Sequence, residues 1–229
     1  MIENLFFDFF EVIANGMYWG GVMGRLVEQR FGILVDDFRK KDTGVCWDLW
    51  KKLNRAEIQE KEYWDKILEV QPWQATSEQF IQCTLDAMRV EIPGTFQIIR
   101  ELHAKGYNLY LVSDVWAEMR DAMLVQYSWI SELFKKCYFS CDFGQIKSDP
   151  GCFEKICQDA GVDPAKSLFV DDYDVNVKRA RKAGMQGIIF ESSAQLRAEL
   201  ERGLGIWGLD VLRLADNPSL FCEDCRDWA

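Results

Sequence analysis

The chain has 229 residues, of which 48% are hydrophobic and 28% charged, and its formal net charge at pH 7 is −10. This length allows one large domain or two small ones with a substantial core, and the composition is that of an ordinary globular protein. The excess of acidic residues argues against nucleic acid or an anionic membrane as a partner, because both bind clustered Lys and Arg.

The sequence carries no signal for a membrane or for export. No apolar segment reaches the roughly 18 residues of a membrane span, and the opening MIENL lacks the basic start of a secretory signal. We therefore expect a cytoplasmic protein that does not contact membranes. Its eight cysteines are then expected to be free thiols rather than a disulfide framework.

The first predicted element is a buried strand in the apolar run LFFDFFEVI, Leu5 to Ile13. A strand covered on both faces needs only apolar side chains, so Asp8 within this run requires a separate reason. Turn residues at 15–16 and 20–21 then interrupt the chain.

Residues 15–90 are predicted to form a helical insertion, or cap. Helical periodicity recurs without a convincing strand in GRLVEQRF, CWDLWKKL, EKEYWDKIL and SEQFIQCTLDAM. Residues 1–14 and 91–229 are predicted to form the core domain, including a C-terminal tail. Most of the five tryptophans of the insertion are expected to be buried core, and a minority, Trp19 first, to face a ligand. Arg25 is a weaker candidate for contact with a ligand anion.

After Pro93, strands and helices alternate. Strands are predicted at 108–114, 138–143, 167–172 and 186–191, and helices at 95–106, within 117–136, at 151–161 and at 175–184. Such alternation is typical of a parallel sheet with helices on both faces. The predicted fold class is therefore α/β, with a Rossmann-like parallel-sheet core and an inserted α-helical cap.

Three apolar runs of this core end in groups that could carry chemistry. They are Asp8, the pair Ser113-Asp114 and the pair Asp171-Asp172. Lys147 lies on the loop GQIKSDP after another predicted strand, and the topology of parallel sheets brings these strand ends to one edge.

Clustered carboxylates must be neutralised, and oxygen ligands at a strand edge suit Mg²⁺. Lys147 could bind the same anionic group and keep the carboxylates ionised. A carboxylate nucleophile beside Mg²⁺ and a lysine is the arrangement for an aspartyl-phosphate intermediate, so these residues indicate phosphoryl transfer.

Four segments also resemble the motifs of the haloacid dehalogenase-like hydrolase superfamily, and within it the phosphatases with a helical cap. They are FFDFFEV, LVSDV, GQIKSDPGCFEKI and LFVDDYDVNVKRARKAG, in the matching order and strand contexts over nearly the whole core. In the insertion, RAEIQEKEYW is similar to a segment common in the branch that includes sugar-phosphate phosphatases.

The resemblance implies a nucleophile and a metal site. Asp8 would be the nucleophile, and Asp8, the backbone carbonyl of Phe10 and Asp172 would be ligands of Mg²⁺. Asp171 would act through a metal-bound water or would hold Lys147.

The resemblance also implies a phosphate site. Ser113, the amide of Asp114 and Lys147 would hold the phosphate of a small phosphorylated metabolite, with Ser113 and Lys147 taking part in catalysis. Asn176 would anchor the start of the following helix. Nothing in the sequence identifies the metabolite.

Two positions depart from the family pattern. Most such phosphatases have a second Asp where this chain has Phe10, and that Asp serves as general acid and base. Losing such help typically costs about 10²- to 10⁴-fold in rate. Glu11 is the nearest spare carboxylate, and Asp114 stands where many relatives have Asn.

Two alternatives to a phosphatase stay open. In a dehalogenase a bulky aromatic would take the position of Phe10, but that metal-free branch does not keep the pair Asp171-Asp172. A catalytically attenuated binding or scaffold protein of the same fold is motivated by Phe10, by Asp114 and by the apolar tail.

Three further features carry weaker signals. The only histidine, His103, is expected to have a structural or surface role. Cys222 and Cys225 have the spacing of half a zinc site, but no second pair of ligands accompanies them. The tail from Gly205 is apolar enough to pack on the core or on a partner, so a homo-oligomer or a protein contact through it stays open.

Overall fold

The computed structural model describes residues 1–16, 21–34, 45–71 and 73–204. The predictions for Trp19, for Cys222 and Cys225 and for the tail from Gly205 lie outside these residues. These residues form no helix that is long and apolar enough to cross a membrane.

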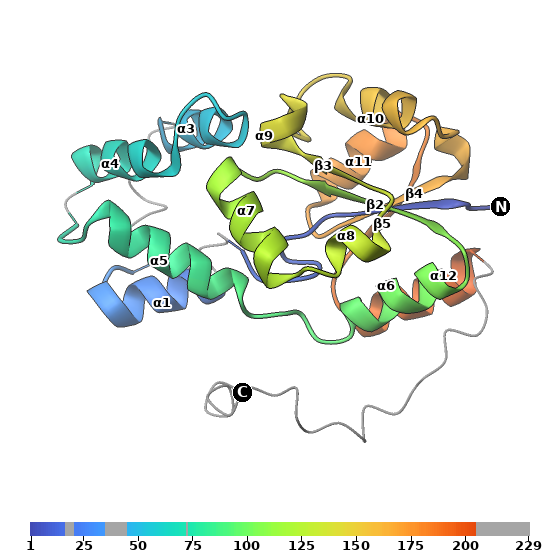
Figure 1. Cartoon of the computed structure of the whole chain (residues 1–229), viewed down its shortest axis with the longest axis horizontal. Coiled ribbons are helices and arrows are strands. Elements are labelled where there is room, and N and C mark those ends of the chain that lie inside the picture. Colours follow the sequence, from blue (N-terminus) through green and yellow to red (C-terminus); the bar gives the residue numbers. More distant parts are fainter. Residues whose placement is uncertain (17–20, 35–44, 72, 205–229) are drawn as a thin grey trace.

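One parallel sheet with the strand order β3-β2-β1-β4-β5 organises the described residues (Figure 1). The strands are β1 (Asn4–Phe7), β2 (Asn108–Ser113), β3 (Lys136–Phe139), β4 (Ser167–Asp171) and β5 (Gln186–Ile189). Phe7 pairs with Leu111 on one side and with Val170 on the other, so β1 occupies the centre. The predicted Rossmann-like α/β fold is confirmed.

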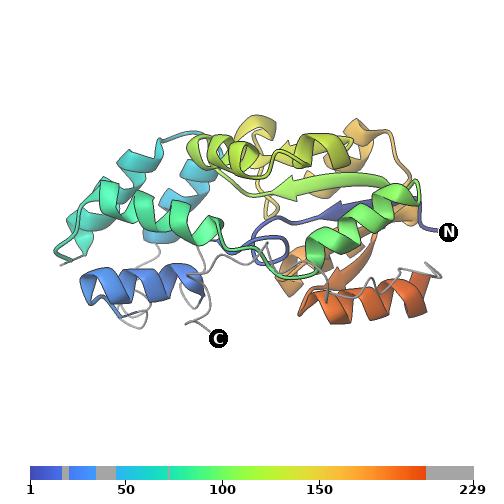
Figure 2. The ribbon, with the colours of Figure 1, turned by 60° about the horizontal axis from the view of Figure 1, so that its bottom comes forward.

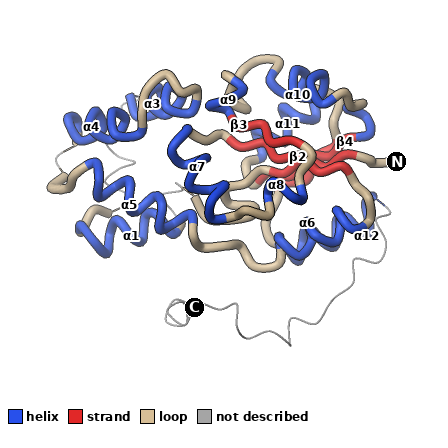
Figure 3. The backbone as a smooth tube through the Cα atoms, in the orientation of Figure 1, coloured by secondary structure: helices blue, strands red, loops and turns tan. Residues whose placement is uncertain are grey.

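Helices cover both faces of the sheet (Figure 3). Leu5 and Phe7 of β1 belong to the apolar cluster with helices on one face, and Phe6 belongs to the cluster on the other. The first face carries α6 (Thr95–Ala104), α7 (Ala117–Gln126), α8 (Ile130–Leu133) and α12 (Ser193–Leu204), and the second carries α10 (Cys152–Ala160) and α11 (Asp174–Lys182). This alternation follows from the two-residue period of a strand.

The predicted strand at 138–143 is wrong in its last four residues. Residues Ser140–Phe143 form the short helix α9, which Gly144 ends in a left-handed conformation with φ of 72°. The Ser140 hydroxyl accepts a hydrogen bond from the Val115 amide (2.9 Å) and donates one to the Asn54 carbonyl (2.6 Å), and these bonds hold the chain away from the sheet.

Four described helices lie together beside the carboxyl ends of the strands (Figures 1 and 2). They are α1 (Val22–Phe31), α3 (Val45–Asn54), α4 (Glu60–Val70) and α5 (Ser77–Met88). Trp64 is fully buried among them and stacks on Phe80, with ring centroids 4.6 Å apart. The boundaries 15–90 for the cap stay a prediction.

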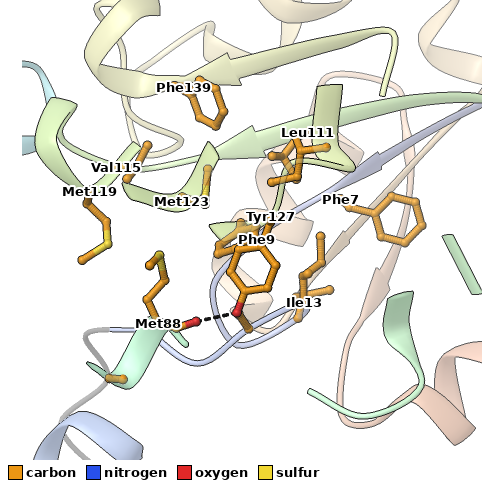
Figure 4. Packing of buried hydrophobic residues seen from close by; sticks show 14 of the residues in the cluster. Phe7, Phe9, Ile13, Met88, Leu111, Val115, Met119, Met123, Tyr127 and Phe139 are labelled. Carbon is orange, nitrogen blue, oxygen red and sulfur yellow. Dashed lines mark hydrogen bonds between the residues drawn. The ribbon is translucent and has the colours of Figure 1, made fainter. Parts of the chain in front are cut away.

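The helical segment shares one buried cluster with a face of the sheet (Figure 4). The Tyr127 hydroxyl on the C-terminal side of α7 donates a hydrogen bond of 2.6 Å to the carbonyl of Met88, the last residue of α5. Phe9 packs edge-on against the Tyr127 ring, with centroids 5.3 Å apart. The segment that follows β1 is therefore fixed from the helical side as well as from the sheet.

Six cysteines lie in the described residues, and no disulfide joins any two of them, as predicted. His103 is exposed near the end of α6, which agrees with a surface role.

Candidate active site

A buried lysine between two aspartates forms the centre of the site. Lys147 Nζ lies 2.5 Å from Asp8 Oδ2 and 2.8 Å from Asp171 Oδ2, and all three side chains are buried. Asp8 follows the last residue of β1, and Asp171 ends β4, so neighbouring strands supply the two carboxylates. The backbone N–H of Lys147 donates to Asp114 Oδ1 (2.9 Å), which ties the lysine loop to the end of β2.

The carboxylate of Asp171 is held by several donors. Its Oδ1 accepts from the Tyr173 amide at 2.8 Å, and its Oδ2 accepts from Lys147. The Asn176 side-chain amide lies 3.2 and 3.3 Å from the two oxygens, and Arg179 in turn donates to Asn176 Oδ1 (3.1 Å). Asn176, predicted to anchor the helix, therefore also orients Asp171.

Asp8, Asp171 and Asp172 form the described group of residues that could hold a metal ion. One oxygen from each lies within 4.8 Å of the others, and Asp172 is exposed to solvent. Carboxylate oxygens are the ligands that Mg²⁺ prefers, so the donor set fits this ion.

The charges in this group are unbalanced. Burial raises the pKa of Asp8 well above its usual value; Lys147 opposes the rise, and Asp171 and Asp172 add to it. Burial also raises the pKa of Asp172, and that of Asp114, to about 6. For Lys147, burial alone lowers the pKa, but Asp171, Asp8 and Asp114 outweigh burial and leave it above its usual value. One buried ammonium thus faces several carboxylates.

These groups border a cavity of about 360 Å³. Asp8, Phe10, Asp114, Lys147 and Asp172 line it, as a common site would require. Ser113 lies behind them at the end of β2, 1% exposed, and its Oγ has no hydrogen-bond partner among the described residues. A buried hydroxyl without a partner is costly, which makes this oxygen a candidate to bond to a ligand.

The chain turns directly after Asp8 and does not continue as a strand. Phe9 N donates to Asp8 Oδ1 (2.7 Å), and Ile13 N donates back to Phe9 O (2.8 Å). Glu11 has a positive φ of 59°, and both Glu11 and Phe10 border the cavity.

Gly16 is required beside Phe10. A Cβ at this position would lie 2.7 to 2.8 Å from three carbons of the Phe10 side chain, which is too close. The Gly16 amide also donates to Glu11 Oε1 (2.9 Å). Burial raises the pKa of Glu11, and the Gly16 amide and the charge of Arg25 oppose that rise.

Some residues around the cavity had not been predicted. Among the described tryptophans of the insertion, Trp47 and Trp50 of α3 line it, whereas Arg25 is exposed on α1 and does not. Trp116 and Arg179 line it too. The position of Trp116, three residues after Ser113 at a strand end, could have predicted that it lines the cavity. No local feature of the sequence predicts this for Arg179.

The helical segment is tied to the loop that carries Lys147. Arg55, just after α3, donates through Nε to Asp149 Oδ2 (3.1 Å) and makes a second contact with Oδ1. Asp149 Oδ2 also accepts from the Ile146 amide (3.0 Å). Asp149 therefore joins the loop that carries Lys147 to the helical segment.

Glu60 is a buried carboxyl behind the cavity. It begins α4, is 3% exposed, and lies against Trp116 and Thr84, both of which border the cavity. Burial raises the pKa of Glu60 to about 7, and the neighbouring indole N–H groups of Trp116 and Trp64 oppose the rise.

Glu60→Gln is expected to change how stability depends on pH. Because the folded-state pKa of Glu60 lies above the unfolded one, the folded protein holds this proton more tightly, and stability falls as pH rises through about 7. The free energy of unfolding of the variant should therefore exceed that of the wild type by on the order of 2 kcal/mol at pH 8. Near pH 5 the two values should match. Urea unfolding at both pH values measures this; an equal difference at both would contradict it.

The chain is similar to several known proteins. Residues 2–184 match the family model described as haloacid dehalogenase-like hydrolase. The chain is 29% identical over 112 residues to bifunctional epoxide hydrolase 2 of Rattus norvegicus, covering 48% of this chain and 20% of that protein. It is 29% identical over 117 residues to flavin mononucleotide hydrolase 1 of Arabidopsis thaliana, covering 50% and 46%. The matched region thus spans less than half of these relatives.

A solved structure shares the fold. An enzyme of the HAD family from Bacteroides thetaiotaomicron, in complex with magnesium and inorganic phosphate, has a TM-score of 0.62 to this chain at 20% identity. The likeness covers 84% of this chain and 96% of that one.

Proposed function

Because the chain belongs to the haloacid dehalogenase-like hydrolase family, we propose that it is a Mg²⁺-dependent phosphomonoester hydrolase that works through an aspartyl-phosphate on Asp8. The observation that carries the proposal is the buried group of Asp8, Lys147 and Asp171 at the edge of the cavity. The name of the Arabidopsis relative, a hydrolase of flavin mononucleotide, supports a phosphate ester as the substrate. A small phosphorylated metabolite is the proposed substrate class.

The proposed reaction has two steps on the Asp8 carboxylate. An oxygen of Asp8 attacks the phosphorus of the ester, the bond from phosphorus to the ester oxygen breaks, and the leaving oxygen becomes an alcohol by taking up a proton. Water then attacks the same phosphorus, which releases inorganic phosphate and restores the carboxylate. Lys147 stabilises the charge on the transferring group, and Asp171 and Asn176 keep the ammonium in position.

The donor set around Asp8 fits a magnesium site. Asp8, Asp172 and the carbonyl of Phe10 would hold Mg²⁺, which when bound supplies positive charge next to the phosphoryl group. Asp171 already accepts from Lys147, Tyr173 and Asn176, so it suits the role of orienting Lys147. The pKa of Asp8, raised by burial, supports the need for a second cation at neutral pH.

Phosphate binding would use the end of β2. The hydroxyl of Ser113, which lacks a partner among the described residues, would donate to a phosphate oxygen. With Phe10 in the position of the usual acid, the leaving oxygen has no carboxyl there to protonate it. Esters with good leaving groups should therefore react fastest.

The test is hydrolysis of p-nitrophenyl phosphate, whose leaving group hardly needs an acid, in Mg²⁺ and in EDTA. Activity is expected in Mg²⁺ and is expected to disappear in EDTA. Mg²⁺ with beryllium fluoride, a phosphate mimic, should also raise the melting temperature, because ligands of the native state stabilise it. Folded protein with neither response would favour the binding or scaffold alternative, and halide release that persists in EDTA would favour a dehalogenase.

A further inference from the structure

Part of the cavity wall is aromatic. Trp47 and Trp50 of α3 stack in parallel, with ring centroids 4.8 Å apart and planes inclined by 7°, and both border the cavity. Trp116 and Met119, at the start of α7, continue this lining from the side of the sheet. Phe10 borders the same space next to the carboxylates.

Two aromatic side chains at this cavity are exposed to solvent. Trp47 is 50% exposed and Tyr173 57% exposed, and they are the exposed aromatic residues that occur within the described ranges. Both border this cavity. Leaving large aromatic surface in water is unfavourable, and such surface commonly marks a binding site.

The helical side of the cavity offers little to a polar group. Its described lining consists of Gly16, Trp47, Trp50 and Thr84, none of which is charged. The Thr84 hydroxyl already donates to the Phe80 carbonyl at 2.8 Å. A leaving group rich in hydroxyls would lose its water here without gaining enough hydrogen bonds, whereas a flat ring would gain contact with the indoles.

We propose that the ester hydrolysed here carries a planar aromatic leaving group, which lies against the indoles that line the cavity while its phosphate occupies the site of Asp8 and Lys147. This inference rests on the proposed function. Met119 and Val175 add aliphatic contacts around the same space. The substrate class is therefore phosphomonoesters of aromatic ring compounds, and sugar phosphates are disfavoured.

The test compares phosphonates, which cannot be hydrolysed, so that differences between leaving groups play no part. Benzylphosphonate, cyclohexylmethylphosphonate and 2,3-dihydroxypropylphosphonate present an aromatic, an aliphatic and a hydroxylated group of modest size. Their Kd values are measured by calorimetry with Mg²⁺, beside that of inorganic phosphate. Benzylphosphonate should bind about 3- to 10-fold more tightly than the cyclohexyl compound, and more tightly still than the dihydroxy compound.

Tryptophan variants test whether the preference for the benzyl compound arises from the lining of the cavity. Trp50→Leu should remove most of the preference for the benzyl compound while the Kd of inorganic phosphate stays unchanged. Trp47→Leu, at a half-exposed position, repeats the test with less risk to folding. Trp129→Leu makes the same change away from the cavity, where Trp129 packs on Phe96, and should keep the preference.

The outcomes separate this inference from the proposed function. If inorganic phosphate binds with Mg²⁺ but the benzyl compound shows no advantage over the cyclohexyl one, the inference is overturned and the phosphatase stands. Tightest binding of the dihydroxy compound would overturn it as well. If inorganic phosphate and all three phosphonates fail to bind folded protein, the phosphoryl site itself is refuted.

Discussion

Asp8→Asn is expected to slow p-nitrophenyl phosphate hydrolysis by about 10⁴-fold or more, the size of loss seen when a nucleophile is removed from other hydrolases. The amide of the variant cannot attack phosphorus. Among the described carboxylates that line the cavity, that of Asp8 contacts Lys147 Nζ, at 2.5 Å. The measurement is steady-state kcat at saturating Mg²⁺. Mass spectrometry after an acid quench should find a phosphoryl group on Asp8 in wild type and none in the variant.

Asp174→Asn provides the matched control for this loss. Asp174 begins α11, has a side chain that is 44% exposed, and pairs with Lys178 rather than with Lys147. The same chemical change there should leave kcat near the wild-type value. If Asp8→Asn retained wild-type activity, or if the phosphoryl group were found on Glu11, the proposed nucleophile would be wrong.

Lys147→Met is expected to lower the rate by about 10²- to 10³-fold, as does the loss of one charge-stabilising donor in other active sites. The substitution keeps the length of an unbranched side chain and removes the ammonium that lies between Asp8 and Asp171. Hydrolysis of p-nitrophenyl phosphate at saturating Mg²⁺ measures the loss. Lys166→Met, which removes an exposed lysine paired with Glu3, should leave the rate unchanged.

Lys147→Met should also be less stable than the wild type, by an amount that depends on pH. Without the ammonium, burial and the other carboxylates act on Asp8 unopposed, so its pKa rises further. Metal-free Lys147→Met should be less stable than wild type by about 3 kcal/mol at pH 8, because buried charges are left unpaired, and by less near pH 5, where protonation removes the charge. A loss that is equal at both pH values would show that the lysine acts only through packing.

Phe10 contributes both to the packing of the turn after β1 and to the wall of the cavity. Its side chain fits closely over Gly16 and packs edge-on against Phe9, with ring centroids 5.0 Å apart. Phe10 is therefore part of the packing around the turn that follows β1, and it also borders the cavity. An aromatic side chain at this position offers no proton to a leaving group and adds apolar surface to the cavity, and both properties favour the aromatic leaving groups proposed above.

The sequence by itself was sufficient for the fold class and for the residues at the strand ends. Apolar runs followed by Asp8, Asp114 and Asp172 indicated that these side chains would meet, because parallel strands end at one edge of the sheet. The structure brings all three, with Lys147, to one cavity. The direction of parallel strands alone brings these residues to one edge of the sheet, whatever the packing of the side chains around them.

Only the tertiary structure decided the local conformations between these strand ends. The run from Leu5 leaves the sheet after Phe7, because the Phe9 amide bonds to Asp8 and the Phe9 carbonyl accepts from Ile13. Ser140 begins a helix where a strand was predicted, because its hydroxyl bonds to Asn54 and Val115. Partners so distant in sequence leave no local pattern.

The wall of the cavity was also decided by tertiary packing. Trp50 and Trp116 are 66 positions apart, and a tryptophan on an amphipathic helix has the same local pattern whether it faces the core or a ligand. Their shared cavity results from the docking of the helical segment, which Arg55, Asp149 and Ser140 help to hold. The positions of the carboxylates and of Lys147 are therefore determined by the strand order, whereas the aromatic part of the cavity wall results from contacts between the helices and the sheet.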